Sequence, residues 1–382
     1  MASESTPAIL TTSAVSYPLD FGSITSLIEY RFTLLDKYVD VNGLATYIVA
    51  SEPMKEKFQE LLLDLANHGL IAKIRKVSDK LVISVLPKQK LNRPRRIVNL
   101  ILLLATIVTV TFASYSLVFE EDPRLISALF HNANLWSQVL VLALSILGIV
   151  GLHETGHVLA VRHHKMDATL PYFVPAPPPL PFGTFGAVIS LRGPPGNRDQ
   201  LFDLGFSGPV AGFLVTITVA VFAYLTAPLV PIQDATSLMT AGLLSARSWP
   251  YSPLFLDLLG EVGWRTVPQG YVMVLTQVAF ASEVGALITF LNLLPVWQLD
   301  GGHISRAALG NQGHKLIALI GFGILFLAGY YGFAILLLFF MFASRRPLEG
   351  VEPLDDVSPL SLSRKILFAL SLVMLVLTFV IF

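Results

Sequence analysis

Long apolar runs dominate this sequence and limit the folds that it can adopt. Residues 97–119 and 139–152 contain no charged side chain, and residues 202–230 form a third run that is almost uncharged. Runs of this length without strict alternation of apolar and polar residues predict membrane-spanning α-helices rather than the strands of a β-barrel. Since 54% of the 382 residues are hydrophobic and 14% are charged, one soluble core could not bury the apolar surface. The sequence therefore predicts an all-α polytopic membrane protein.

Six or seven membrane segments are expected in all. Residues 271–294 and 366–382 have the composition of further spans. Residues 316–343 are apolar over 28 positions, but Gly329 and Gly332 near the middle favour a short helical hairpin over one long span.

The basic residues that flank the apolar runs predict the orientation of the protein. Residues 88–96 carry five basic side chains directly before the first run, and Arg345 and Arg346 follow the expected hairpin. By the positive-inside rule, both segments are expected on the cytoplasmic or equivalent face. We therefore expect a multi-pass protein of a cell membrane, or of a thylakoid or other chloroplast membrane if the source has plastids, with its N-terminal domain on the cytoplasmic face.

The first 96 residues have the pattern of a small soluble α+β domain. Residues 45–50, 70–75 and 81–86 resemble strands, and after the first of these Phe58, Leu61, Leu62 and Leu65 fall on one helical face. The pattern predicts a compact βαββ unit behind a loose tail at residues 1–14. The chain is thus expected to divide into residues 1–96 (soluble domain and basic linker), 97–135 (first span and outer loop), 136–306 (membrane core) and 307–382 (C-terminal membrane segments).

The motif HETGH follows directly on the run at residues 139–152 and supplies His153, Glu154 and His157. Residues four apart share one face of a helix, so the two histidines could bind one metal ion while Glu154 accepts a proton from an attacking water. Ionisable side chains are costly at membrane depth and typical of functional sites there. The alternative is a pair of buried histidines that hydrogen bond to their neighbours. Because the chain has no cysteine, a metal would have to be held by His, Asp or Glu.

A third ligand is predicted in the segment NLLPVWQLDGGH, which follows the fourth expected span. Both helices are expected to run inward and to carry their polar motif at the inner end, so Asp300 would lie at the depth of His153 and His157. Two imidazoles and one carboxylate leave one position on zinc open, as a catalytic site requires. The alternative interpretation of Asp300 is a turn residue before Gly301 and Gly302.

A proline-rich segment separates the two motifs. Residues 171–200 contain prolines at a density that excludes a helix and favours extended backbone. They also contain Gly183, Gly186 and the β-prone residues 187–191. The pattern predicts a short strand or hairpin beside the HETGH helix, with a rigid connecting loop as the alternative.

These motifs together resemble the site-2 protease family of intramembrane zinc metalloproteases, and most closely its archaeal, cyanobacterial and chloroplast branch without a PDZ insertion. The resemblance rests on HETGH and NLLPVWQLDGG in two spans and on FGTFGAVI and SGPVAG between them, and it covers about residues 137–306. It implies a metalloprotease core in which His153, His157 and Asp300 bind Zn²⁺ and Glu154 is catalytic.

The resemblance also implies how substrate is held. Asn292 matches the asparagine of the family's NxxPxxxLDG motif and is implied to face the site and to help hold the substrate or its oxyanion. The family's loop that binds substrate as a strand matches Gly183, Gly186, Ala187, Val188, Ile189 and Ser190.

The expected function is that of an intramembrane zinc metalloprotease that cleaves within or near transmembrane segments of other proteins, in regulated intramembrane proteolysis. Its partners would be a transmembrane protein substrate and the lipid bilayer. The alternatives are a transporter or other metal-binding membrane protein, and a catalytically silent scaffold. A transporter would be expected to show internal repeats, which the sequence lacks, and would not need Glu154. A formal charge of zero gives no argument for a nucleic-acid partner, and the sequence does not determine the oligomeric state.

Overall fold

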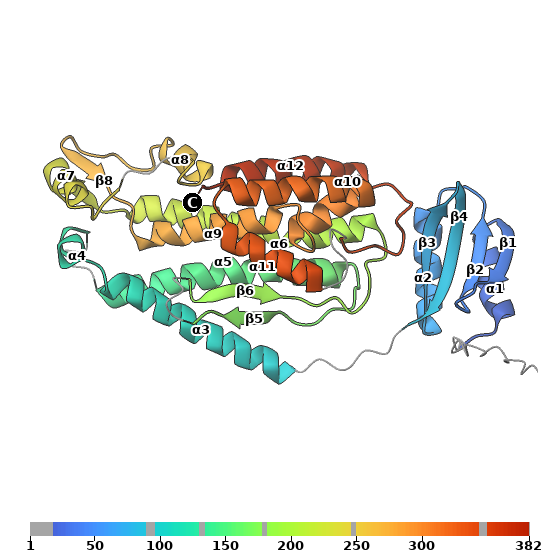
Figure 1. Cartoon of the computed structure of the whole chain (residues 1–382). Coiled ribbons are helices and arrows are strands. Elements are labelled where there is room, and N and C mark those ends of the chain that lie inside the picture. The colour runs from blue at the N-terminus through green and yellow to red at the C-terminus, as the bar shows by residue number, and fades with distance from the viewer. Residues whose placement is uncertain are drawn as a thin grey trace, which may run out of the picture. The chain divides into compact units, whose positions relative to one another are not determined.

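The computed structural model describes residues 18–88, 96–129, 134–177, 182–245, 250–343 and 350–381 (Figure 1). The chain forms two compact units. One contains the residues up to Asn92 together with Pro194–Arg198 and Glu352–Pro359, and the other contains Arg93–Gly193, Asp199–Val351 and Leu360–Phe382. The predictions for the tail at residues 1–14, for most of the basic segment at residues 88–96 and for Arg345 and Arg346 lie outside the described residues.

The N-terminal unit contains an antiparallel four-stranded sheet in the order β1-β2-β4-β3. Its elements are α1 (Phe21–Glu29), β1 (Leu34–Val39), β2 (Ala45–Val49), α2 (Lys55–Asn67), β3 (Leu70–Val77) and β4 (Lys80–Pro87). Alternate residues of β3 and β4 are buried, and Phe58, Leu61 and Leu65 of α2 pack in the same core. The alternation of apolar residues and the helical face seen in the sequence thus define this core.

The predicted βαββ elements are present, but α1 and β1 were not predicted. Strand β1 has the sequence LLDKYV and is exposed at nearly every position, so no apolar alternation marks it. Helix α1 is nine residues long, and its clearest signal is the N-cap Asp20, whose carboxylate accepts from the Ser23 N–H at 3.1 Å. That bond and the one from the Ser23 hydroxyl lower the pKa of Asp20.

Two short segments from later in the chain complete the N-terminal unit. The Ile74 N–H donates to the Leu354 carbonyl at 2.9 Å, and the Leu354 N–H donates to the Pro195 carbonyl at 2.8 Å. Arg198 pairs with the Asp356 carboxylate at 3.1 Å. These contacts explain why Pro194–Arg198 and Glu352–Pro359 cluster with this unit.

In the second unit, three of the described helices are long and apolar enough to cross a membrane. They are α3 (Arg96–Phe119), α5 (Leu135–His163) and α6 (Arg198–Thr226). Helices α9 (Gln277–Leu293) and α11 (Tyr331–Ala343) are shorter and apolar. The remaining helices are α4 (Pro123–Leu129), α7 (Ile232–Thr240), α8 (Leu254–Gly260), α10 (Asp300–Leu327) and α12 (Leu362–Thr378). A helical membrane unit was predicted, whereas the number of spans remains a prediction.

Helices α6 and α12 begin and end about one turn earlier than predicted, and two other helix starts differ by more. The fourth apolar helix begins at Gln277 rather than at residue 271, because Tyr271–Met273 form β8 and pair with β7 (Leu229–Pro231). Helix α10 begins at Asp300 rather than at residue 316, and Gly310, with φ of 71°, interrupts its regular geometry. The α10–α11 pair is joined by a short turn around Gly329, as the hairpin prediction required.

A β-hairpin lies beside α3 and α5 (Figure 1). It consists of β5 (Tyr172–Pro175) and β6 (Thr184–Val188) in antiparallel pairing. Strand β6 begins and ends a few residues before the strand predicted at residues 187–191. Helix α3 fixes the hairpin: Asn99 Nδ2 donates to the Leu170 and Pro171 carbonyls at 2.9 and 2.8 Å, and the Thr109 hydroxyl donates to the Gly183 carbonyl at 2.6 Å.

Candidate metal centre

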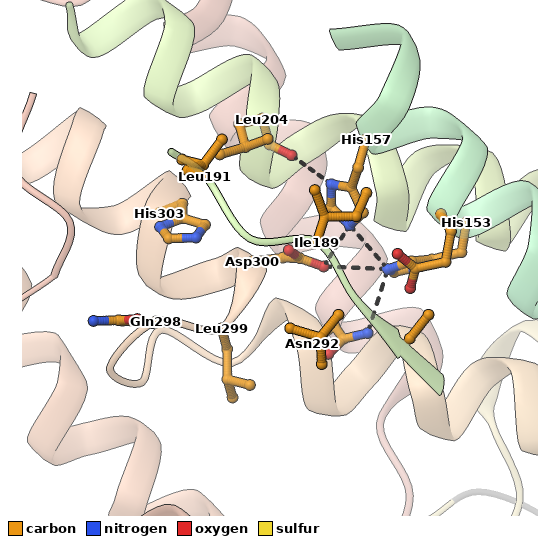
Figure 2. Close-up of a pocket in the computed structure, with 13 residues that line it drawn as sticks. His153, His157, Ile189, Leu191, Leu204, Asn292, Gln298, Leu299, Asp300 and His303 are labelled. Atoms are coloured by element: carbon orange, nitrogen blue, oxygen red, sulfur yellow. Dashed lines mark hydrogen bonds and ion pairs between the residues drawn. The ribbon is translucent and has the colours of Figure 1, made fainter. Parts of the chain in front are cut away.

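Three predicted ligands converge at one point of the second unit (Figure 2). His153 and His157 lie one turn apart on α5, and Asp300 is the first residue of α10. Asp300 Oδ2 is 3.3 Å from His153 Nε2 and 3.4 Å from His157 Nε2, and the two Nε2 atoms are 3.2 Å apart. The structure therefore brings together two residues of one motif and one residue from a motif more than 140 positions later.

The three donor atoms have the spacing that a zinc ion requires. Ligand atoms about 2.0–2.1 Å from zinc in tetrahedral geometry are about 3.4 Å from one another. The three edges of the His153, His157 and Asp300 triangle are 3.2–3.4 Å. The donor set and its spacing thus fit a zinc ion with three protein ligands and one open position.

The hydrogen bond of His157 orients its ring for metal binding. His157 Nδ1 donates to the Leu204 carbonyl of α6 at 2.8 Å. A carbonyl can only accept, so Nδ1 carries the proton and Nε2 presents its lone pair to the centre. His153 differs, because its buried Nδ1 has no hydrogen-bond partner in the described part of the chain.

Glycines of α6 leave room for the two imidazoles. A Cβ atom at Gly208 would overlap the ring of His157, and one at Gly212 would be 3.1 Å from the Nδ1 atom of His153. Helix α5 also has a glycine where it approaches α6: a Cβ atom at Gly156 would overlap the Ser207 carbonyl. Small residues allow helices to approach closely, and at Gly208 and Gly212 of α6 the imidazole rings of α5 fill the space.

Glu154 and Asn292 lie at the same cavity as the three ligands. The cavity is about 230 Å³ in volume and is lined by both side chains. Glu154 is 6% exposed, and the backbone N–H of Ala187 lies within hydrogen-bonding range of its carboxylate. Asn292 Nδ2 is 3.5 Å from His153 Nε2 (Figure 2). An amide donor and a carboxylate therefore both face the position where a bound substrate carbonyl could lie.

Part of the predicted substrate loop lines the cavity. Ala187, Val188 and Ile189 do so, whereas Gly183, Gly186 and Ser190 are not among the lining residues. The Ser190 carbonyl accepts from the Thr169 N–H at 2.9 Å, and the Ser190 N–H donates to the Thr169 hydroxyl at 3.0 Å. Backbone groups alternate along an extended strand, so those of Ala187, whose N–H lies near Glu154, and of Ile189, one residue beyond β6, are expected on the opposite edge.

Several residues of this site were not assigned by sequence reasoning. Leu191, Leu204, Gln298, Leu299 and His303 also line the cavity. His303 follows Asp300 by about one helical turn, and the DGGH spacing could have indicated that it lies on the same face. Nothing in the local sequence marks Leu204, because it contributes a backbone carbonyl.

The two histidines after the motif do not join the metal centre. His163 is exposed, and His164 Nε2 hydrogen bonds Asp203 at 2.7 Å.

Several known proteins that the chain resembles are named as zinc metalloproteases. The chain is 26% identical over 292 residues to "Probable zinc metalloprotease EGY2, chloroplastic" of Oryza sativa subsp. indica, an alignment that covers 75% of this chain and 51% of that protein. It is 27% identical over 271 residues to the Arabidopsis thaliana protein of the same name, covering 69% of this chain and 47% of that protein. It is 28% identical over 250 residues to "Probable zinc metalloprotease EGY1, chloroplastic" of Arabidopsis thaliana, covering 63% and 42%.

The chain spans about half the length of the curated relatives that it matches first. No solved structure matches it. The model of Peptidase family M50 matches residues 141–337, which include both ligand motifs and α6 between them. The resemblance to site-2 proteases is thereby confirmed, and the chain belongs to Peptidase family M50.

Proposed function

We propose that this protein is an intramembrane zinc endopeptidase that cleaves peptide bonds within or near the transmembrane segments of other membrane proteins. One observation carries the proposal: a donor triangle with zinc spacing shares its cavity with the Glu154 carboxylate, and two of its three residues lie on α5, a helix apolar enough to span a membrane. Transport would need no proton acceptor at this position. The names of the relatives support a zinc metalloprotease, and the apolar helices support a substrate that is itself in the bilayer.

Each site residue has a distinct part in peptide hydrolysis. A zinc ion held by His153, His157 and Asp300 would polarise the scissile carbonyl and lower the pKa of a water. Glu154 would accept the proton of the attacking water and later deliver it to the leaving amine. The Asn292 amide, aimed at His153 Nε2, would donate a hydrogen bond to the negative charge that develops on the carbonyl oxygen.

A membrane topology accompanies the proposed function. We propose six or seven spans, with the N-terminal unit and the metal centre toward the cytoplasmic or equivalent face. The supporting features are the basic residues at positions 88–96 and the three long apolar helices. Cleavage near the inner face would release a fragment to that side, as regulated intramembrane proteolysis requires.

The first experiment measures zinc and cleavage together. Purified full-length protein in bilayer vesicles is expected to contain about one zinc per chain and to cleave at least one member of a panel of single-span proteins. A chelator is expected to abolish cleavage, and added zinc is expected to restore it. Stoichiometric zinc without cleavage of any member would favour a metal-binding or transport function, and cleavage that survives zinc removal would contradict the proposal.

We propose that β6 binds the substrate as an added strand. A helical peptide bond must be unfolded locally before cleavage, and its unpaired polar groups are costly in lipid unless the enzyme supplies partners. One edge of β6 pairs with β5, and the Ala187 N–H on the other edge lies near Glu154. Ile189, the next residue of the same alternation, lines the same cavity. This edge can supply main-chain partners to an extended substrate.

Proline at Ile189 tests strand addition. Ile189→Pro removes a donor from the substrate-facing edge, so we expect cleavage of a helical substrate to fall about tenfold, which corresponds to one unmade hydrogen bond. Ile189→Leu retains the N–H and is the matched control. Zinc content should be normal in both variants. Cleavage of a substrate with helix-breaking residues at the cut should fall less in Ile189→Pro. If Ile189→Pro and Ile189→Leu cleaved a stable helical substrate at equal rates, strand addition would be contradicted and the hairpin would be a rigid connector.

A further inference from the structure

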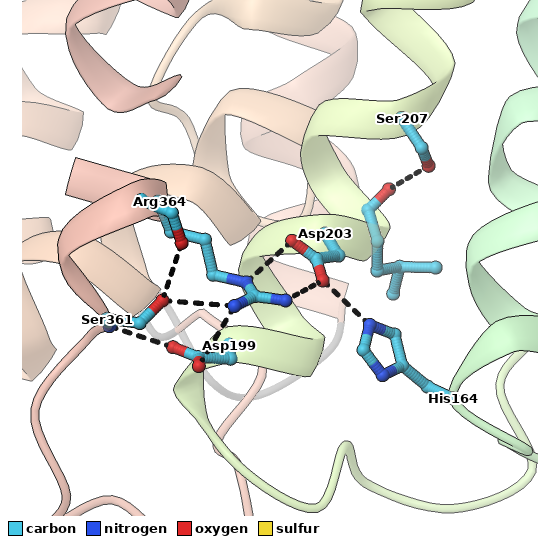
Figure 3. Close-up of polar contacts among 8 residues, drawn as sticks. His164, Asp199, Asp203, Ser207, Ser361 and Arg364 are labelled. Carbon is cyan, nitrogen blue, oxygen red and sulfur yellow. Dashed lines mark hydrogen bonds and ion pairs between the residues drawn. The ribbon is translucent and has the colours of Figure 1, made fainter. Parts of the chain in front are cut away.

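A polar cluster connects the C-terminal end of α5, the first turns of α6 and the start of α12 (Figure 3). Its centre is Arg364 of α12, whose guanidinium bonds both oxygens of Asp203, with Nε 2.8 Å from Oδ1. Its Nη1 atom also reaches Asp199 Oδ2 at 3.1 Å. Asp203 Oδ2 accepts from His164 at 2.7 Å, and Asp199 Oδ1 accepts from the Ser361 N–H at 3.0 Å. The cluster therefore joins the end of α5, the first turns of α6 and the start of α12.

The first turns of α6 also hold the carbonyl that orients a metal ligand. Leu204 follows Asp203 directly, and its carbonyl accepts the Nδ1–H of His157 at 2.8 Å. Arg364 and His164 thus fix the side chain of Asp203, while the backbone of Leu204 is bonded to the ring of His157. A shift of this helical turn would move the acceptor of His157.

Helix α6 is weakened just beyond this point, so its own hydrogen bonds do not fully fix the turn. Pro209 lies inside the helix and has no N–H to donate to the Gly205 carbonyl one turn earlier. Gly205 and Gly208 flank the same region and lower the helix propensity further. The Leu204 carbonyl also accepts from the Ser207 hydroxyl at 3.3 Å within α6. Arg364 adds an anchor from outside the helix, because it bonds two carboxylates that are four residues apart on one face.

We propose that Arg364 is a positioning residue for the metal centre. By clamping Asp199 and Asp203, it fixes the Leu204 carbonyl and, through it, the ring of His157. The proposal rests on the proposed function only in that His157 binds the metal. It gives α12, which lies beyond the residues matched by the family model, a part in metal binding.

The test compares the zinc affinity of matched variants of the full-length protein. Arg364→Met is expected to weaken zinc binding about tenfold, the lower end of the 10- to 100-fold typical of changes to the partners of a metal-ligating histidine, because Arg364 acts on His157 through Leu204. Arg364→Lys keeps one charge but not the paired geometry, so its affinity should be intermediate. The affinities would be measured by competition with a chelating dye. The visible absorption of the Co²⁺-substituted protein should also change in Arg364→Met, because it reports ligand geometry.

Arg198→Met is the matched control. Arg198 also lies at the start of α6 and pairs with an aspartate, Asp356, but it does not touch Asp203 or Leu204. Its zinc affinity and Co²⁺ spectrum should equal those of the wild type. If Arg364→Met does not fold, Asp203→Asn removes the same ion pair with little change of shape and should give the same two results.

Two results would overturn the inference. One is wild-type zinc affinity with an unchanged Co²⁺ spectrum in a folded Arg364→Met or Asp203→Asn variant. The other is an equal loss in Arg198→Met, which would indicate general destabilisation. Either result would leave the proposed protease function intact if the wild type binds zinc and cleaves. A wild-type protein that binds no zinc would refute the metal centre and this inference together.

Discussion

Glu154→Gln is expected to bind zinc like the wild type and to lose cleavage activity by about 10²- to 10⁴-fold, the usual contribution of a general base. The substitution keeps the size of the side chain, and none of the three donor atoms of the metal triangle belongs to it. An amide cannot accept the proton of the attacking water. The measurement is the initial rate of cleavage of a single-span substrate, with zinc content determined on the same sample.

A glutamate elsewhere in the membrane unit provides the control for that variant. Glu283 lies on α9 and does not line the cavity that contains Glu154. Glu283→Gln should therefore cleave at a rate close to that of the wild type. Full activity of Glu154→Gln would contradict the assignment of the general base, and loss of zinc from it would mean that Glu154 also supports the ligands.

The part of the site that follows from local periodicity could be predicted from the sequence. His153 and His157 are four residues apart in an apolar helix, so their common face follows from helix geometry alone. Asp300 was predicted as the third ligand from its expected depth and from the ligand set that zinc prefers, because no local rule states which distant segments meet. The structure places it at the start of α10 rather than in a turn, 3.3–3.4 Å from both imidazoles.

The residues that support the site could not be predicted, because their contacts join distant parts of the chain. Leu204 acts through its carbonyl, and any residue type would supply one. Arg364 could have been interpreted as a basic residue at the end of a membrane helix, since its partners Asp199 and Asp203 are more than 150 positions away. The same limit applies to β1, which is held in the sheet by backbone pairing with β2 rather than by buried side chains of its own.

Gly208→Ala is expected to weaken zinc binding by at least about tenfold and to reduce cleavage with it. The added methyl group would overlap Nε2 of His157, the atom that faces the metal. The ring cannot move aside freely, because its Nδ1–H is bonded to the Leu204 carbonyl and its Nε2 is 3.4 Å from Asp300 Oδ2. Alanine is the better helix former by about 1 kcal/mol. The substitution should therefore favour the helix while it damages the metal centre.

Gly151→Ala separates this steric effect from the general effect of adding a methyl group. Gly151 lies on α5 two residues before His153, and a Cβ atom there would meet no other atom within 4 Å. Its zinc affinity and cleavage should equal those of the wild type, and the helix should gain about 0.5–1 kcal/mol. The measurement is the zinc affinity of the two variants and of the wild type, determined by competition with the same chelating dye. If Gly208→Ala bound zinc as tightly as Gly151→Ala, α6 would be able to move away from His157, and the glycine would not be required for the metal centre.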